Sequence, residues 1–254
     1  MATIHVFRHA EAMHNVDTAF RDERDPGLSA KGIQDSKNLA DEIHMPVVNV
    51  FSSPLRRAIQ TSRYVFPEKQ IIPLPQITEA GSSASGFGSP REALIREFGR
   101  RINANYLPGT YANLDPDSPF AYDLPKIEAR FAQARKFLAS QAAAAGPGAN
   151  IAVITHGQSC HFLTEDWEGP VPGEWRADWD GNLKYRSYTI DSSTGDWYET
   201  VASRLRRKCP PYPVPGDQAV QEETRKFLCN RIIERTQEVR KLYDKYRVPK
   251  AVSN

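Results

Sequence analysis

The eleven-residue stretch HVFRHAEAMHN, residues 5–15, contains three histidines, an arginine and a glutamate. It begins within the short apolar run TIHVF, residues 3–7, which is typical of a buried strand. Histidine can act as a nucleophile, as a proton donor or acceptor, or as a metal ligand. The stretch alone therefore leaves three interpretations open: a catalytic centre, a metal site, or a loop that tolerates histidines.

A metal site is disfavoured by the spacing of the candidate ligands. His9 and Glu11 satisfy the H-x-E pattern of zinc deaminases, but the P-C-x-x-C partner of that pattern is absent. His9 and His14 are five residues apart, whereas zinc ligands on a helix are usually four apart. The chain contains no C-x-x-C pair and no G-x-S-x-G elbow. We therefore predict no metal, no other cofactor and no serine or cysteine nucleophile.

Polar residues follow three predicted strands at the point where each strand ends. Arg8 and His9 follow the first run, His156 follows ANIAVIT at 149–155, and Arg57 comes shortly after VVNVF at 47–51. Because the carboxyl ends of parallel strands meet at one edge of a sheet, we expect these side chains to converge. Two histidines and two arginines form a cationic pocket that suits a phosphoryl group.

Each residue of this pocket has a chemical role that its type permits. We expect His9 to accept a phosphoryl group on an unprotonated ring nitrogen, while Arg8 and Arg57 bind the equatorial oxygens. His156 would donate to the same oxygens, and the Gly157 amide at a helix start would add an anion contact.

A proton donor for the leaving oxygen is also needed, and Glu79 is placed for that role just beyond the run QIIPLP. The arginines at positions 21, 24, 91 and 96 are further candidates for contacts with anionic groups of a substrate.

Strand-like and helix-like segments alternate along the chain. Strands are predicted at 3–7, 47–51, 70–74 (an edge strand, because of its proline) and 149–155, with a hairpin over 185–201 turning at Thr194-Gly195. Helices are predicted at 29–44 with Ser29 as its cap, from Pro54, at 90–102, from Pro125, and at 221–246. This alternation predicts an α/β three-layer sandwich, with a mainly parallel central sheet flanked by helices. We expect a single domain over 1–254, with a lid or insert at about 81–124 and a C-terminal helical extension at about 210–254.

The overall composition limits the partners. The net charge of +2 is too small to indicate a nucleic acid or an acidic membrane surface. No apolar run reaches the roughly 18 residues of a membrane span, and no signal sequence is apparent. We predict a cytoplasmic protein whose partner is a small phosphorylated molecule. The oligomeric state stays open, because the C-terminal helix could form a homodimer or simply cover the sheet.

Four motifs resemble those of the histidine phosphatase superfamily, whose members include the phosphoglycerate mutases. RHAEAMHN at 8–15 resembles its R-H-G-E-x-x-x-N, and LSAKG at 28–32 resembles its L-[ST]-x-x-G. SSPLRRAIQTS at 52–62 resembles S-x-L-x-R-A-x-x-T, and VITHGQS at 153–159 supplies the second histidine. The resemblance implies a phosphoglycerate mutase-like fold with His9 as the phosphohistidine nucleophile. It also implies Arg8, Arg57 and His156 as the phosphate pocket, Asn15 as an assisting residue and Glu79 as the general acid.

Departures from the family pattern guide the choice of activity. Ala10 replaces the usual glycine, Gln158 stands where mutase-like members tend to have asparagine, and VDTAFRDERDPG replaces the mutase segment F-x-G-W-x-D. The leading hypothesis is a metal-independent phosphatase that hydrolyses phosphomonoesters through phosphohistidine on His9. The alternatives are a phosphoglycerate-mutase-like phosphotransferase, and a non-catalytic module on the same fold that binds a phospho-ligand or a protein.

Overall fold

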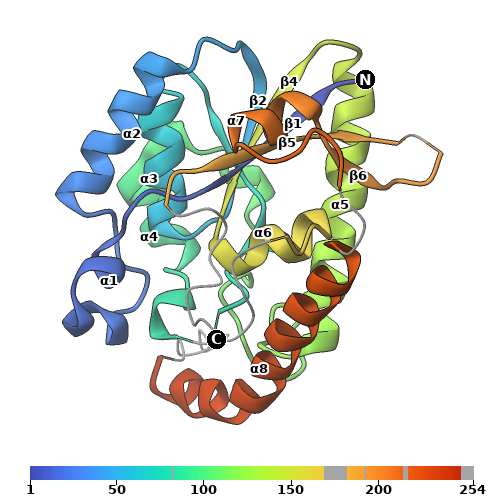
Figure 1. Cartoon of the computed structure of the whole chain (residues 1–254). Helices are drawn as coiled ribbons and strands as arrows, with labels where there is room; N and C mark the ends of the chain where they lie inside the picture. Colours follow the sequence, from blue (N-terminus) through green and yellow to red (C-terminus); the bar gives the residue numbers. More distant parts are fainter. Residues whose placement is uncertain (82, 169–181, 192, 214–216, 247–254) are drawn as a thin grey trace.

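The computed structural model describes residues 1–81, 83–168, 182–191, 193–213 and 217–246. Within these residues, a six-stranded sheet is covered by helices on both faces (Figure 1). The predicted α/β three-layer fold is confirmed.

The central sheet has the strand order β3-β2-β4-β1-β5-β6. Its parallel part consists of β1 (Thr3–Arg8), β2 (Val47–Ser52), β3 (Ile71–Pro73) and β4 (Asn150–Thr155). Its antiparallel part consists of β5 (Tyr185–Ile190), which pairs with β1, and β6 (Trp197–Glu199), which pairs with β5. Because β2, β4 and β1 are neighbours in this order, the residues that follow them emerge side by side at the carboxyl edge.

Alternate residues of the central strands belong to two hydrophobic clusters. On β4, Ile151 and Val153 belong to the cluster that contains α5 (Leu124–Ala145). Ala152 and Ile154 belong to the cluster that contains α3 (Arg56–Val65), on which α2 (Ala30–Glu42) packs. Since successive side chains point to opposite faces, a strand that is apolar throughout must be covered on both. Figure 1 shows α2 and α3 at the left of the sheet and α5 at the right.

Several local predictions are confirmed. Ser29 caps α2, because its Oγ accepts the Gly32 N–H at 3.0 Å. β3 is an edge strand and ends at Pro73, which has no N–H to donate to a further strand. The hairpin of β5 and β6 turns at Gly195, whose φ of 81° suits glycine.

Three boundaries differ from the prediction. Pro54 does not lie in the first turn of a helix, because α3 begins at Arg56. The backbone N–H of Arg56 donates to the Asp25 carboxylate at 2.9 Å. The helix predicted over 90–102 is α4 (Arg91–Phe98), since Gly99 has a φ of 52° and a short 3-10 turn follows. The last helix, α8 (Asp217–Tyr246), begins four residues earlier than predicted, with an acidic residue in its first turn.

The segment predicted as an insert, residues 81–124 (called the insert below), and α8 both pack on the body of the protein. Residues of the insert, among them Leu94, Phe98 and Tyr111, form a cluster with Ile59 of α3. Leu228 and Ile232 of α8 join the cluster of α5, and burying each such side chain contributes about 1.5–3 kcal/mol. The remaining helices are α1 (Met13–Val16), α6 (Gly157–Thr164) and α7 (Val201–Arg206).

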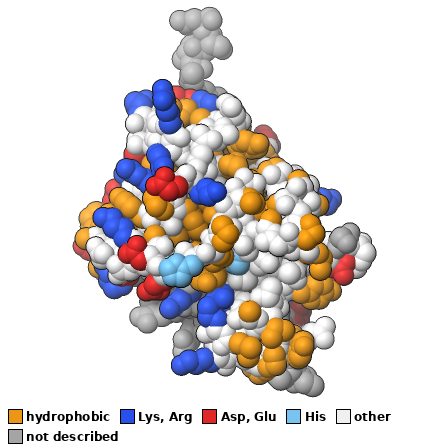
Figure 2. All heavy atoms as spheres, turned by 90° about the horizontal axis from the view of Figure 1, so that it is seen from above, with side chains coloured by type: hydrophobic (Ala, Val, Ile, Leu, Met, Phe, Trp, Pro, Cys, Tyr) orange, Lys and Arg blue, Asp and Glu red, His pale blue; other side chains and the backbone are white. Residues whose placement is uncertain are grey.

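Charged side chains are mixed on the surface. On the face in Figure 2, basic side chains (blue) lie in small groups, with acidic (red) and hydrophobic (orange) ones between them. This distribution accords with the near balance of 33 basic and 31 acidic residues. Among the helices of the described chain, none combines the length and the apolar character that a bilayer crossing requires.

Candidate active site

The carboxyl ends of β1, β2 and β4 bring three of the predicted site residues together. His9 follows β1, Arg57 lies in the first turn of α3 after β2, and His156 follows β4. The centroids of the His9 and His156 rings are 5.1 Å apart. The backbone N–H of His9 donates to the Thr155 carbonyl oxygen at 2.9 Å, which holds the loop after β1 against the end of β4.

Two contacts fix the tautomer of His9. Its Nδ1 lies 2.6 Å from the Ala10 carbonyl oxygen, which can only accept, so Nδ1 carries the proton. The Arg57 Nε–H donates to His9 Nε2 at 3.2 Å, and a guanidinium has no acceptor, so Nε2 presents its lone pair. Arg57 is held in turn by the Ser85 carbonyl oxygen, which accepts from Nη1 at 2.7 Å. The pocket therefore contains an unprotonated ring nitrogen beside a fixed cation.

The electrostatics keep His9 uncharged. The residue is 2% exposed, and its burial holds the pKa of the ring well below the usual range. The positive charges of Arg57 and Arg8 lower this pKa further. At neutral pH, His9 is consequently a neutral imidazole in cationic surroundings.

His156 has one ring nitrogen engaged by the protein and one without such a partner. Its Nε2 lies 2.7 Å from Ser53 Oγ at the end of β2. Its buried Nδ1 has no hydrogen-bond partner in the described part of the chain, and Glu79 Oε2 lies 3.9 Å away. Burial is the largest cause that holds the pKa of His156 well below the usual range, followed by Arg57 and His9. Because an unpartnered buried polar atom is costly, Nδ1 is suited to contact a bound ligand.

Glu79 lies beside His156 with its carboxylate oriented by two donors. Its Oε1 accepts the Ala80 N–H at 2.8 Å and the Ser159 hydroxyl at 3.2 Å, while Oε2 is the oxygen nearer His156. A side chain at position 81 would place its Cβ 3.2 Å from Glu79 Cγ, so Gly81 gives the carboxylate room. The Glu79 side chain is 16% exposed and can exchange protons with solvent.

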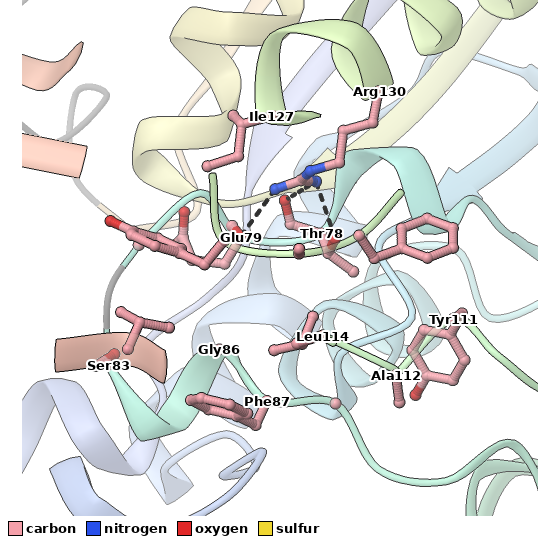
Figure 3. Close-up of a pocket in the computed structure, with 16 residues that line it drawn as sticks. Thr78, Glu79, Ser83, Gly86, Phe87, Tyr111, Ala112, Leu114, Ile127 and Arg130 are labelled. Atoms are coloured by element: carbon pink, nitrogen blue, oxygen red, sulfur yellow. Dashed lines mark hydrogen bonds between the residues drawn. The ribbon is translucent and has the colours of Figure 1, made fainter. Parts of the chain in front are cut away.

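A buried arginine holds the backbone that carries Glu79. Arg130 of α5 is 4% exposed, and its Nη1 donates to the carbonyl oxygens of Gln76 and Thr78 at 2.8 and 2.7 Å. Its Nη2 donates to the Glu79 carbonyl oxygen at 3.1 Å (Figure 3). Burial lowers the pKa of Arg130 to about 10, so the guanidinium remains charged at neutral pH.

Of the other predicted site residues, Arg8 and Gly157 are buried beside the two histidines, whereas Asn15 is exposed. Arg8 is 7% exposed and close enough to His9 to lower its pKa. Gly157 is buried and begins α6, directly after His156. Asn15 is exposed, and its Oδ1 accepts the Ala12 N–H at 3.0 Å, so this hydrogen bond lies within its own turn and not in the pocket.

The four candidate arginines for further anionic groups have varied positions. Arg24 donates from Nε and Nη2 to the Gly88 carbonyl oxygen at 3.0 and 2.5 Å. Arg91 donates to the carbonyl oxygens of Leu107 and Ala104 at 2.8 and 3.3 Å. These two residues therefore hold the backbone of the insert. Arg96 is exposed on α4, and the side chain of Arg21 lies outside the described residues.

Three further residues complete the site, and two of them, Ser53 and Thr61, stand at fixed positions of the motif S-x-L-x-R-A-x-x-T. Ser53 and Ser85 contact His156 and Arg57, and Thr61 Oγ1 accepts the Ala10 N–H at 3.0 Å. Ser85 contacts Arg57 through its main-chain carbonyl oxygen, so its residue type gave no signal in the sequence. Arg130 could have been noticed, because it lies three residues after Ile127 on the apolar stripe of α5, where a charge requires partners.

The fold and the site together define a class of protein. It is an α/β protein with a cationic pocket at the carboxyl edge of a parallel sheet, built around a neutral histidine and a nearby carboxylate. Its sequence matches the model of the histidine phosphatase superfamily (branch 1) over residues 4–203, and the chain belongs to this superfamily. The match ends before α8 begins.

Similar solved structures agree with this fold. A proposed alpha-ribazole-5'-P phosphatase from Escherichia coli is 19% identical, with a TM-score of 0.51 over 78% of this chain and 95% of that chain. YhfR from Bacillus stearothermophilus is 16% identical, with a TM-score of 0.50 over 78% and 95%. A phosphoserine phosphatase from Entamoeba histolytica is 18% identical, with a TM-score of 0.49 over 79% and 95%. No curated protein sequence matches the chain significantly. At these identities the first two structures, with TM-scores of 0.51 and 0.50, establish the fold alone.

Proposed function

We propose that the protein is a metal-independent phosphatase, which hydrolyses phosphomonoesters of small molecules through a phosphohistidine on His9. The observation that carries this proposal is the state of His9: its Nε2 is unprotonated and receives an N–H from Arg57. A neutral nucleophile beside fixed cations is the arrangement that phosphoryl transfer requires. Membership of the superfamily supports the same chemistry.

In the first step, the Arg57 N–H turns from His9 Nε2 to a phosphate oxygen. The freed lone pair of Nε2 attacks the phosphorus atom, and the bond to the leaving oxygen breaks. Arg8 and Arg57 neutralise the equatorial oxygens, and His156 donates to them from Nδ1, the nitrogen without a protein partner. Glu79 gives its proton to the leaving oxygen, so that a neutral alcohol departs. His9 Nδ1 keeps its proton and continues to donate it to the Ala10 carbonyl oxygen, and this hydrogen bond stabilises the phosphorylated ring.

In the second step, water attacks the phosphohistidine from the side that the alcohol has left. The nitrogen–phosphorus bond breaks, and the Glu79 carboxylate takes a proton from the attacking water. Inorganic phosphate leaves, and His9 and Glu79 return to their initial states. No metal ion is required, because Arg8 and Arg57 supply the positive charge and His156 adds a hydrogen bond.

The experiment is a test for phosphohistidine together with phosphate release. The protein is mixed with phenyl phosphate and quenched in alkali, where phosphohistidine survives, and His9 is examined by mass spectrometry. We expect phosphate release with a labelled His9, and loss of both in His9→Ala. A parent protein that folds and binds phosphate but is never labelled would support a non-catalytic binding module instead.

A phosphotransferase related to the phosphoglycerate mutases would use the same phosphoenzyme. The two activities separate when 3-phosphoglycerate is supplied and isomerisation is measured against phosphate release. Isomerisation faster than phosphate release would overturn the phosphatase assignment.

A further inference from the structure

Asp25 is a buried carboxylate close to the phosphate pocket, and the proposed reaction does not use it. It lies in the segment between α1 and α2 and is 0% exposed. Its φ of 49° is in the left-handed region, which aspartate and asparagine adopt more readily than most other residues. Because a buried charge is costly without partners, the contacts of this carboxylate indicate what it does.

The two carboxylate oxygens of Asp25 join two segments that are far apart in the sequence. Oδ1 accepts the backbone N–H of Arg56 at 2.9 Å, and Oδ2 accepts the backbone N–H of Ser89 at 2.9 Å. Arg56 is the first residue of α3, and Ser89 belongs to the insert. Asp25 therefore fixes the start of α3 relative to the insert.

Arg57 depends on both of these segments. It follows Arg56 in the first turn of α3, so the start of this helix sets the position of its backbone. Its Nη1 donates to the carbonyl oxygen of Ser85, four residues before Ser89. Asp25 thus holds the backbone that carries the Arg57 guanidinium and also the segment that orients it toward His9.

The contacts around Asp25 fasten the same part of the insert. Arg24 donates to the Gly88 carbonyl oxygen, and the Tyr111 hydroxyl donates to the Ser89 carbonyl oxygen. The 3-10 turn Thr18–Asp22 packs against the 3-10 turn Ala84–Gly86. Since the backbone at 88–89 is held in this way, the Ser85 carbonyl oxygen meets Arg57 at a defined place.

The charge of Asp25 offsets an unfavourable feature of α3. The first turn of α3 contains Arg56 and Arg57 and no acidic residue, and the N-cap residue Leu55 has no side-chain acceptor. A helix N-terminus carries a partial positive charge, which disfavours cations there. Asp25 supplies an anion to this end from outside the helix. Burial lowers the pKa of Arg57, and the carboxylates of Glu79 and Asp25 oppose this effect, which favours the charged guanidinium.

We propose that Asp25 is a positioning residue of the active site, which holds the start of α3 and the insert together and thereby places Arg57 to bind the transferred phosphoryl group. The proposal rests on the proposed phosphatase activity. It differs from a purely structural role, because it requires folded variants to lose rate through Arg57 and independently of the leaving group.

The first experiment measures kcat/KM for phenyl phosphate and 4-nitrophenyl phosphate in Asp25→Asn. Asparagine tolerates the left-handed φ, but it is uncharged and accepts through one oxygen only, so one N–H loses its partner. We expect kcat/KM to fall about tenfold or more, by the same factor for both substrates, because both present the same phosphoryl oxygens to Arg57. Asp41→Asn is the matched control, since Asp41 is exposed on α2, and its values should equal those of the parent.

Glu79→Gln provides the contrast for a defect at the leaving group. 4-Nitrophenolate departs without a proton more readily than phenolate, so loss of the acid should affect phenyl phosphate more than 4-nitrophenyl phosphate. If Asp25→Asn gives the same unequal loss as Glu79→Gln, Asp25 acts on the acid and not on Arg57, and the proposal is overturned.

The second experiment asks whether the effect of Asp25 passes through Arg57. Asp25→Asn is introduced into Arg57→Met, which has no guanidinium to position. We expect it to lower kcat/KM by less than about twofold there, against about tenfold or more in the parent, because residues that act together give non-additive effects. An equal fall in the two backgrounds would contradict the proposal.

Folding is checked by circular dichroism, and the free energy of unfolding is measured in urea. If Asp25→Asn is unfolded, a comparison of Arg56→Pro with Arg56→Ala decides the question. Both variants lose the ion pair with Glu97, but proline also lacks the N–H that Asp25 binds, and proline suits the first position of a helix. We expect kcat/KM to fall in Arg56→Pro and to stay near the parent value in Arg56→Ala.

Two results separate the failure of this proposal from the failure of the proposed function. A folded Asp25→Asn protein that is less stable but keeps the kcat/KM of the parent would show a merely structural role and refute positioning. Labelling of His9 by phenyl phosphate is measured in the same samples. A labelled His9 in the parent with an unaffected Asp25→Asn removes only the role of Asp25, whereas an unlabelled His9 in the parent removes the proposed function.

Discussion

Replacing Arg130 by methionine tests how the proposed acid is held. Methionine fills a similar volume but cannot donate, so the variant loses the hydrogen bonds to the Gln76, Thr78 and Glu79 carbonyl oxygens, and a further one to Thr78 Oγ1 at 2.9 Å. A hydrogen bond from a charged donor contributes about 1.5–3 kcal/mol, and leaving its buried partners unsatisfied adds to the loss. Part of the loss is offset because a buried charge is also removed.

The net cost of Arg130→Met is therefore about 3–5 kcal/mol, because four hydrogen bonds from a charged donor are lost and only part of that loss is offset. For a chain of this length, each kcal/mol lowers Tm by about 2–4 °C, so the fall is about 6–20 °C. The free energy of unfolding is measured in urea, and Tm by calorimetry. Lys136→Met is the control, because Lys136 is exposed on the same helix, and the change should stay within about 0.5 kcal/mol.

Activity provides the second readout for Arg130. A shift of the 76–79 segment moves Glu79 relative to the leaving oxygen, and a misplacement of about 1 Å can cost about a hundredfold in rate. We expect kcat for phenyl phosphate to fall in Arg130→Met while KM changes little. Arg130→Lys, which keeps the charge and part of the hydrogen bonding, should lie between. An Arg130→Met protein that loses less than about 1 kcal/mol of stability and keeps its kcat would refute the reasoning.

Three further predictions concern packing, the second histidine and pH. Gly32→Ala should lower the free energy of unfolding in urea by about 1–3 kcal/mol, since its Cβ would lie 2.0 Å from the Glu11 carbonyl oxygen. The control Gly109→Ala should be nearly neutral, because no atom lies within 4 Å of the added Cβ. Equal losses in the two variants would contradict the packing argument. Ser53→Ala removes the hydrogen-bond partner of His156 Nε2, so kcat for phenyl phosphate should fall about tenfold while the protein still folds. Ser140→Ala is the control, because Ser140 is exposed. An unchanged kcat in Ser53→Ala would exclude a role of Ser53 in positioning His156. The pKa values of buried His9 and His156 are lowered, so below pH 6.5 the unfolded chain binds protons that the folded chain does not. The free energy of unfolding should therefore fall as pH drops below 6.5, by up to about 1.4 kcal/mol per pH unit for each histidine. Urea unfolding at pH 7.5 and 5.0 measures this dependence, and His9→Asn should make it weaker. The same pH dependence in His9→Asn as in the parent would contradict the lowered pKa of His9.

The sheet and the main site residues could be predicted because they follow from local patterns. Four apolar runs separated by helical segments imply a parallel sheet, and a parallel sheet places the residues after its strands at one edge. This topology brings His156 to His9, and the structure finds their rings 5.1 Å apart. Proton positions could not be predicted, since the tautomer of His9 depends on the Ala10 carbonyl oxygen and on Arg57, whose orientation is set by Ser85 in the insert.

Element ends and irregular segments were less predictable for a physical reason. The start of α3 depends on Asp25, a residue far away in the sequence that accepts the Arg56 N–H. The end of α4 depends on a single glycine with positive φ. Asn15 matches the family motif, yet its Oδ1 accepts the Ala12 N–H of its own turn, because a motif specifies residue types and not the partner each residue finds.

The buried arginines of this site are satisfied in a way that preserves their positive field. The terminal nitrogens of Arg57 and Arg130 donate to carbonyl oxygens of the 76–85 segment. A carboxylate in those places would accept from the same N–H groups, but it would also neutralise the positive charge that stabilises a bound phosphate. Carbonyl oxygens are neutral dipoles, so they offset the desolvation of the guanidinium groups and leave the net charge in the pocket. The main-chain carbonyl oxygens of the 76–85 segment therefore stabilise Arg57 and Arg130 without neutralising them. This accounts for the use of backbone acceptors, and not acidic side chains, as partners of the two arginines.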